Sequence, residues 1–315
     1  MRYCRPAPSI LVLLFSAIIT SAQTPAAAQK YFQQGAKNLT DGNLAMAFEN
    51  YSRAIEISSR LDSRNPKSAN LATASNFGFR EADNVTVIDP FTAFAYTNRG
   101  IVRYRQNDVD GAIADFTAAL RISPRLAEAY VGRGAAHRAK GNDEQARTDF
   151  DRAIQINDRF VEAYTDRADL RLAKNDIEGA LADLNKALKL NPRLAEAHYL
   201  FGYLNLAKKE YDSSLASFDR AIQLKPEMAA AYAGRGATLV SLNEFDKAIV
   251  DFNRALELDL QLTNAYMNRG LTYLLKHDDV HAQKDFDECL ALNPALKTEL
   301  QRRIELAKEL RGTKQ

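Results

Sequence analysis

Two histidines near the end of the chain have the spacing of a pair of metal ligands. His277 and His281 are four residues apart, so a continuous helix would present both imidazoles on one face. Their acidic neighbours are Asp278, Asp279 and Asp285. However, His277 falls in a predicted turn between two helices, and Asp285 has an arginine partner in the repeat described below. The pattern therefore predicts no metal site, and we expect the protein to need no cofactor.

Other residues with nucleophilic or acid–base chemistry lack the companions that catalysis requires. Cys289 occupies a place that the repeat gives to small residues, which favours packing in the core. His198 replaces a core aromatic residue and is expected to be packed or hydrogen-bonded. The sequence contains no phosphate-binding loop, no nucleophile elbow and no two-cysteine metal motif. We therefore predict that the protein is not an enzyme.

Five arginines recur in a short phrase, and a row of them could bind an anionic ligand. The phrase "AYTNRG" at residues 95–100 returns with small changes at 129–134, 163–168, 231–236 and 265–270. In each copy Arg follows Tyr by three residues, which places both on nearly the same face of a helix. Whether these arginines bind a ligand depends on what the fold places opposite them.

The phrase belongs to a repeat with a period of 34 residues. Its units start at Ala93, Ala127, Val161, Ala195, Ala229 and Thr263, with an outlying unit that starts near Ala28. In most units the fourth residue is aromatic, the eighth is Gly or Ala, the twentieth is small and the twenty-fourth is large and apolar. Turn sequences such as "KGND" divide each unit into two helices. One such hairpin cannot bury its apolar face alone, but stacked hairpins share a continuous core.

This pattern resembles the tetratricopeptide repeat (TPR) family over residues 28–61 and 93–296. The first range would hold one repeat and the second six in tandem. The resemblance implies an all-α fold, a right-handed α-α superhelix or TPR solenoid of about seven helical hairpins. An apolar stripe after Pro294 predicts that residues 297–315 form a capping helix and a tail.

Residues 62–92 interrupt the repeat as an irregular insertion. They hold no full helical stripe, only a short strand-like run, "NVTVI". A connection of this length is usually either disordered or functional, and the sequence leaves both readings open.

The twenty-third residue of each unit indicates what the arginines do. Where the seventh residue is Arg the twenty-third is Asp, and the two units without the Arg also lack the Asp. The matched pairs are Arg99/Asp115, Arg133/Asp149, Arg167/Asp183, Arg235/Asp251 and Arg269/Asp285. The two members of a pair lie at the same height in an antiparallel hairpin. We therefore expect a partly buried structural ion pair that fixes the register of each hairpin, rather than a ladder for an anionic ligand.

The first residues of the chain have the features of an export signal. Arg2 and Arg5 precede the apolar run "SILVLLFSAIIT", and small residues follow it. This run is shorter than the ~20 residues that span a bilayer. We predict a signal peptide over residues 1–22, with cleavage after Ala22 or Ala28, and an exported protein that is periplasmic or secreted. The 42 basic and 40 acidic residues leave the chain near neutral, so neither nucleic acid nor an anionic membrane is an expected partner.

In TPR solenoids the second, fifth, ninth and twelfth residues of each first helix point into a concave groove. In the later units these positions are mostly apolar, which is typical of an interaction site. The predicted partner-binding groove consists of Tyr199, Tyr203, Leu206, Val240, Met267, Leu271 and Leu274. We predict a non-catalytic scaffold or adaptor that binds a peptide or helix of another protein there.

Two alternatives to partner binding stay open at the level of the sequence. The protein could be a self-associating structural protein whose groove or open solenoid end pairs with a second copy. The groove could also be filled from within the chain, by residues 62–89 or by the terminal helix.

Overall fold

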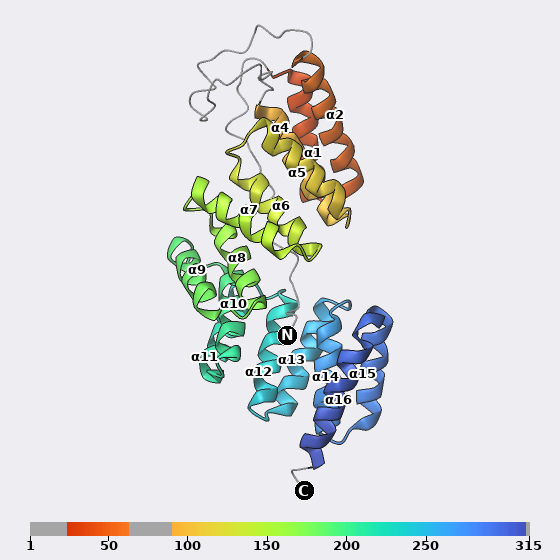
Figure 1. Ribbon diagram of the computed structural model, residues 1–315. Helices are drawn as coiled ribbons and strands as arrows, with labels where there is room; N and C mark the ends of the chain where they lie inside the picture. Colours follow the sequence, from red (N-terminus) through yellow and green to blue (C-terminus); the bar gives the residue numbers. More distant parts are fainter. Residues whose placement is uncertain (1–23, 63–89, 313–315) are drawn as a thin grey trace. The chain divides into compact units, whose positions relative to one another are not determined.

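The computed structural model describes residues 24–62 and 90–312, and the regular secondary structure of these residues is entirely helical (Figure 1). The predicted all-α fold is therefore confirmed. The predicted signal peptide and the strand-like run of the insertion lie outside the described residues.

The helices form successive antiparallel hairpins, each with a first and a second helix. The early hairpins are α1 (Ala26–Thr40) with α2 (Leu44–Asp62), α4 (Pro90–Arg105) with α5 (Val109–Ile122), and α6 (Ala127–Ala139) with α7 (Asp143–Ile156); the helices α8 (Val161–Ala173) and α9 (Ile177–Leu190) follow them. The later hairpins are α10 (Ala195–Ala207) with α11 (Tyr211–Leu224), α12 (Ala229–Ser241) with α13 (Phe245–Leu258), and α14 (Thr263–Leu275) with α15 (Asp279–Leu292). A 3-10 turn (Pro294–Leu296) then leads into α16 (Lys297–Gly312).

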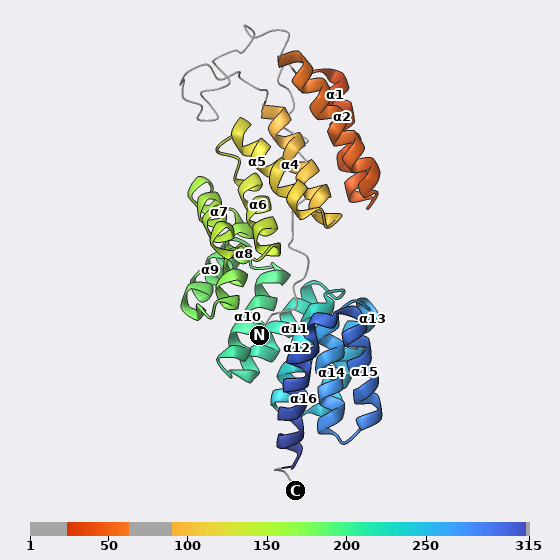
Figure 2. The same cartoon turned by 45° about the vertical axis from the view of Figure 1, so that its right-hand side comes forward.

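These helices belong to two compact units, which divide the chain between residues 170 and 171, within α8. In the first unit, the first helices α1, α4 and α6 lie side by side. In the second unit, α10, α12 and α14 form a similar row, and α16 continues it. Second helices such as α5 and α11 contact both the first helix of their own hairpin and that of the next one. Each unit therefore has a layer of first helices and a layer of second helices (Figures 1 and 2).

The turns inside the hairpins follow from residues that end one helix and start the next. Asn107 has a φ of 65° just after α4, and His277 has a φ of 64° just after α14. A left-handed residue at this place ends a helix by satisfying its last carbonyl groups. Asp108 then accepts a hydrogen bond from the Gly111 amide at 3.0 Å and caps the start of α5. His277 thus lies in a turn, as the sequence predicts.

In two of the hairpins, the core contains a phenylalanine, Phe116 or Phe218, that packs against glycines of two first helices. Phe116 of α5 is fully buried, between Gly100 of its own hairpin and Gly132 of the next. A Cβ atom at Gly132 would lie 2.4 Å from Cε1 of Phe116, which leaves no room for any side chain. This close approach explains why the repeat places Gly or Ala at fixed positions of the first helices.

Candidate functional site

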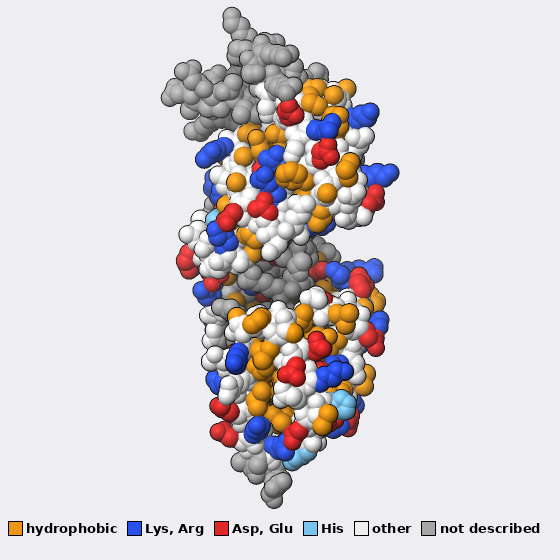
Figure 3. Space-filling view, turned by 90° about the vertical axis from the view of Figure 1, so that its right-hand side faces the viewer, with side chains coloured by type: hydrophobic (Ala, Val, Ile, Leu, Met, Phe, Trp, Pro, Cys, Tyr) orange, Lys and Arg blue, Asp and Glu red, His pale blue; other side chains and the backbone are white. Residues whose placement is uncertain are grey.

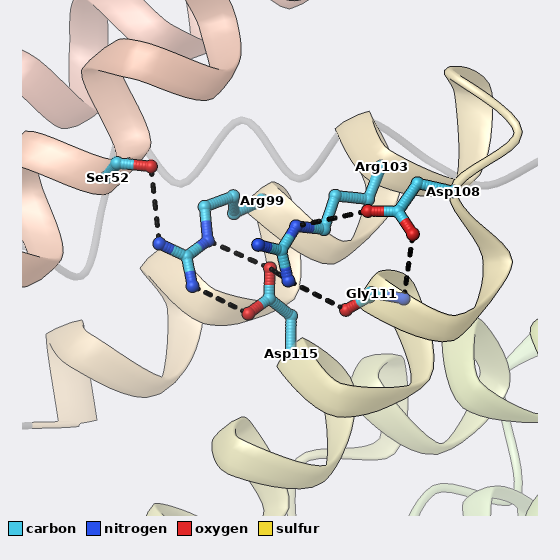
Figure 4. A network of polar contacts seen from close by, with 6 residues as sticks. All are labelled: Ser52, Arg99, Arg103, Asp108, Gly111 and Asp115. Atoms are coloured by element: carbon cyan, nitrogen blue, oxygen red, sulfur yellow. Dashed lines mark hydrogen bonds and ion pairs between the residues drawn. The ribbon is translucent and has the colours of Figure 1, made fainter.

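Four of the five predicted Arg/Asp pairs are joined by two hydrogen bonds each. In the first pair, Arg99 donates from Nε and Nη2 to the two carboxylate oxygens of Asp115, at 2.8 and 2.7 Å (Figure 4). The same two nitrogens make the same bonds at 2.6–2.9 Å in the pairs Arg133/Asp149, Arg235/Asp251 and Arg269/Asp285. The four aspartates are buried, whereas the arginines remain partly exposed.

In this geometry each of the four guanidinium groups is bound to a carboxylate. Hydrogen bonding to Asp149 raises the pKa of Arg133 above its ordinary value, although burial acts in the opposite direction. Both charges are therefore held in place, and neither is available to an anionic ligand without leaving the other unpaired in a buried setting. The pairs join the two helices of a hairpin, which is a structural role.

Each arginine of the phrase also contacts the tyrosine three residues before it. The guanidinium carbon of Arg99 lies 5.3 Å from the ring centre of Tyr96, and that of Arg133 lies 5.5 Å from the ring centre of Tyr130. Such cation–π contacts add to the attraction at a partly desolvated site. The recurring spacing of Tyr and Arg therefore has a physical cause.

A third contact ties each arginine to the preceding hairpin, and the sequence reasoning missed it. Nη1 of Arg99 donates to Ser52 of α2 at 3.2 Å (Figure 4). The corresponding contacts are Arg133 to Thr117, Arg167 to Asp151, Arg235 to Asp219 and Arg269 to Asn253. All five acceptors occupy the twenty-fifth position of their units. The signal in the sequence is weak, because these residues share only the ability to accept a hydrogen bond.

A second arginine, one turn further along the first helix, supports two of the hairpins. Arg103 donates to the Gly111 carbonyl oxygen at 3.0 Å and lies 3.3 Å from Asp115 (Figure 4). Arg171 donates in the same way to the Gly179 carbonyl oxygen, at 2.9 Å. Each of them ties the end of a first helix to the start of its second helix.

The two members of the remaining predicted pair, Arg167 and Asp183, belong to different compact units. Their contact stays a prediction. Within its own unit Arg167 donates to Asp151 at 2.6 Å. In the other unit Asp183 accepts from Arg171 at 2.7 Å.

Units that lack the arginine use neutral contacts instead. In the unit that starts at Ala195, Asn205 donates to Ser217 at 3.2 Å. In the first unit, the Asn50 amide donates to the Met46 carbonyl oxygen of its own helix at 2.8 Å. The hairpin fold therefore tolerates the joint loss of both charges.

The predicted groove residues differ in how far they are open to solvent. Tyr199, Met267 and Leu274 are buried, with 2%, 3% and 4% of their surfaces exposed. The partly exposed members are Tyr203, Leu206, Val240 and Leu271. The expectation that all seven side chains project freely from the first helices is therefore wrong for the three buried residues.

Contacts between neighbouring helices explain these burials. The fifth position of the first helix is buried in all seven units of the described ranges, and Tyr199 and Met267 occupy it. The ring of Tyr199 packs edge-on against Tyr203, with 5.0 Å between the ring centres. Tyr203 packs in turn against Phe218 of α11 at 5.2 Å. Tyr203 therefore supports the core as well as reaching the surface.

The terminal helix contributes to the packing around Met267 and Leu274. Both residues belong to one apolar cluster with Leu300 and Ala307 of α16. The part of the predicted groove beside α14 is therefore occupied by α16, a segment of the same chain.

The apolar positions that stay partly open lie on three neighbouring first helices. We call them the inner-row surface, and they are Tyr203 and Leu206 of α10, Ala237 and Val240 of α12, and Leu271 of α14. They occupy the ninth and twelfth positions of their units, and no charged residue is among them. Elsewhere, on the face drawn in Figure 3, Lys and Arg are interspersed with Asp and Glu, which agrees with the near-neutral composition.

The residues with metal-binding or nucleophilic chemistry are not members of the inner-row surface. His281 contacts Asp278 at 2.7 Å, and no cluster of three or more His, Cys, Asp or Glu in the described ranges could hold a metal ion. Cys289 is fully buried in the core, and burial raises the pKa of its thiol. His198 is partly buried and contacts the Pro192 carbonyl oxygen at 3.1 Å.

Comparison with known families identifies the repeat. Family models described as tetratricopeptide repeat match residues 97–159, 165–229 and 229–261. The chain belongs to the tetratricopeptide repeat family. TPR proteins in general serve as protein–protein interaction scaffolds. No curated protein matches this TPR chain.

Solved TPR structures share the fold. A tetratricopeptide repeat protein from Parabacteroides merdae ATCC 43184 is 19% identical, with a TM-score of 0.63 over 90% of this chain and 100% of its own. The APC/C hetero-tetramer Cut9-Hcn1 is 18% identical, with a TM-score of 0.62 over 83% of this chain and 55% of its own. Yeast Tom70 is 19% identical, with a TM-score of 0.54 over 94% of this chain and 66% of its own. Identities this low show the fold alone.

Among residues 24–62 and 90–312, no helix is both long enough and apolar enough to cross a membrane.

Proposed function

We propose that this TPR protein is a non-catalytic scaffold that binds an apolar segment of another protein on its inner-row surface. The observation that carries the proposal is the run of partly exposed apolar residues on α10, α12 and α14, without a charge among the five. Contiguous apolar surface of this kind is typical of interaction sites, whereas scattered apolar residues are not.

The shape of the surface favours a helix or an extended segment as the ligand. Ala237 lies between the larger side chains of α10 and α14, and Ala230 and Ala233 of α12 are buried. Ala237 is the small residue in the middle of the row, and the larger residues of α10 and α14 can flank a side chain that packs on it. Affinity would come from the burial of apolar area rather than from charge pairing.

The proposed setting is outside the cytoplasm, and it rests on residues 1–22 of the sequence. A charged start, an apolar run and small residues favour export followed by cleavage. We expect mass spectrometry of the mature protein to find Gln23 or Gln29 at its start. Retention of residues 1–22 would contradict the proposed export.

A binding experiment with a matched pair of leucines tests the proposed function. Leu206 belongs to the inner-row surface, whereas Leu260, 66% exposed, lies between α13 and α14. We expect Leu206→Asp to abolish the capture of a partner from a periplasmic or extracellular extract, and Leu260→Asp to leave capture intact. Equal capture by both variants would contradict the proposal.

Self-association is a distinct outcome of the same experiment. Light scattering of the purified protein reports whether the species that binds is a second copy of the chain. A dimer that Leu206→Asp dissociates would replace the scaffold proposal by the self-associating alternative.

A further inference from the structure

The joint between the first two hairpins buries polar side chains on both of its helices. Ser58 of α2 and Thr92 of α4 share a hydrogen bond of 2.6 Å between their hydroxyl groups, and both are buried. Tyr51 of α2 and Asn98 of α4 are fully buried, each at 0% exposure. Four polar side chains are therefore buried in the interface between α2 and α4, which pack together.

Tyr51 and Asn98 occupy positions that face each other in the repeat. Tyr51 is the twenty-fourth residue of the first unit, and Asn98 is the sixth residue of the next. Their equivalents at the next joint are Phe116 and Gly132, where a Cβ on the glycine would lie 2.5 Å from Cζ of the phenylalanine. The hydroxyl of a tyrosine is bonded to this Cζ atom. The register of the repeat therefore directs the Tyr51 hydroxyl toward the place on α4 from which the Asn98 side chain projects.

These polar atoms are buried without a partner among the described residues. They are the Tyr51 hydroxyl oxygen and both the oxygen and the nitrogen of the Asn98 amide. Burial raises the pKa of Tyr51 far above its ordinary value, against the opposing effect of the positive charge of Arg105, so the hydroxyl stays protonated and can donate. Buried polar groups in native proteins almost always bond to protein or to internal water.

We propose that the joint between α2 and α4 holds an internal water molecule, bound by the Tyr51 hydroxyl and by the oxygen and nitrogen of the Asn98 amide. An internal water typically makes about three hydrogen bonds, and these three atoms supply that number. The hydroxyl oxygen can accept as well as donate, and the amide offers one acceptor and a donor. Hydrated contacts of this kind would hold two helices together at a joint whose equivalent between α5 and α6, Phe116 with Gly132, has no polar side-chain atom.

A crystal structure that resolves ordered water is the direct test of this site. We expect density for one water at about 2.7–3.2 Å from the Tyr51 hydroxyl and from both polar atoms of the Asn98 amide. A direct hydrogen bond between Tyr51 and Asn98 that leaves no space for water would overturn the proposal.

Thermal melting of full-length variants gives an independent readout. We expect Tyr51→Phe and Asn98→Ala each to lower the melting temperature by about 2–4 °C, because each leaves the water with fewer bonds. The double variant should melt no lower than either single one, since no polar atom then remains to be satisfied. Asn268→Ala is the matched control and should change the melting temperature little. Asn268 is the sixth residue of its unit, as Asn98 is, but the residue at the position of Tyr51 is there Phe252, which has no hydroxyl group. A neutral or stabilising Tyr51→Phe would also overturn the proposal.

Discussion

Arg133 and Asp149 form two parallel hydrogen bonds across a single hairpin, at 2.9 Å from Nε and at 2.7 Å from Nη2. The side chain of Asp149 is only 5% exposed, so its negative charge is compensated by the arginine rather than by water. Removal of one member of such a pair leaves an unpaired charge in a poorly solvated place, which costs more than the pair itself contributes.

The first prediction concerns this pair. We expect Arg133→Leu alone to lower the free energy of unfolding by about 3 kcal/mol, at the low end for buried pairs because Arg133 is 22% exposed. Arg133→Leu with Asp149→Ser should recover most of that loss, since the unit with Phe201 and Ser217 folds without the pair. Denaturant unfolding of the double-mutant cycle measures the coupling, and simple additivity of the losses would contradict it.

A second prediction separates the two carboxylates that Arg235 contacts. Asp251 belongs to the same hairpin and its side chain is 7% exposed, whereas Asp219 of the preceding hairpin is 58% exposed. We expect Asp251→Ala to cost about 3 kcal/mol and Asp219→Ala about 0.5 kcal/mol, because solvent screens the exposed contact. Denaturant unfolding of both variants gives the two values. Equal costs would mean that the link between hairpins is as strong as the link within one.

The third prediction concerns the contribution of Tyr203 to stability. Its ring packs on Phe218 at 5.2 Å, so Tyr203→Ala should lower the free energy of unfolding by about 2 kcal/mol. Tyr203→Phe keeps the ring and should lose much less. Thermal or denaturant unfolding of the two variants measures the difference. An unchanged stability of Tyr203→Ala would show that the ring is dispensable to the core.

The fourth prediction concerns the pH dependence of the terminal helix. Hydrogen bonds from Arg302 and Arg303 lower the pKa of Glu299 to about 2, from an ordinary value of 4.5. A lowered pKa means that the contact stabilises α16 fully above pH 4.5, and that this stabilisation disappears as the pH falls from 4.5 toward 2. Carbon NMR titration of the Glu299 carboxylate should show a midpoint near 2. The double variant Arg302→Gln with Arg303→Gln should return the midpoint to the ordinary range, and a midpoint already near 4.5 in the parent protein would contradict the contact.

The hairpins and their ion pairs could be predicted from the sequence because their signals recur. Arg and Asp appear together or are lost together at two fixed positions, and residues such as Asn107 mark the turns. The link from Arg99 to Ser52 could not be predicted in the same way. The residue that accepts this hydrogen bond differs from unit to unit, so the sequence shows no recurring residue type at that position.

The burial of two predicted groove residues, Met267 and Tyr199, depends on neighbours that a helical offset does not reveal. A helical offset places Met267 on the right face of α14, but α16 then covers it, and α16 lies outside the repeat. Tyr199 is buried as well, because the adjacent rings of Tyr203 and Phe218 fill the space around it. Periodicity gives the direction of a side chain along its helix, whereas burial depends on which helix lies opposite.

Site-specific photo-crosslinking tests the central claim most directly, with two valines as a matched pair. A benzophenone amino acid replaces either Val240 on the inner-row surface or Val250 of α13, which is 65% exposed. We expect irradiation in the native extract to give a covalent adduct with a partner protein from position 240 and none from position 250. An adduct from position 250 alone, or none from position 240, would contradict the binding of a partner on the inner-row surface.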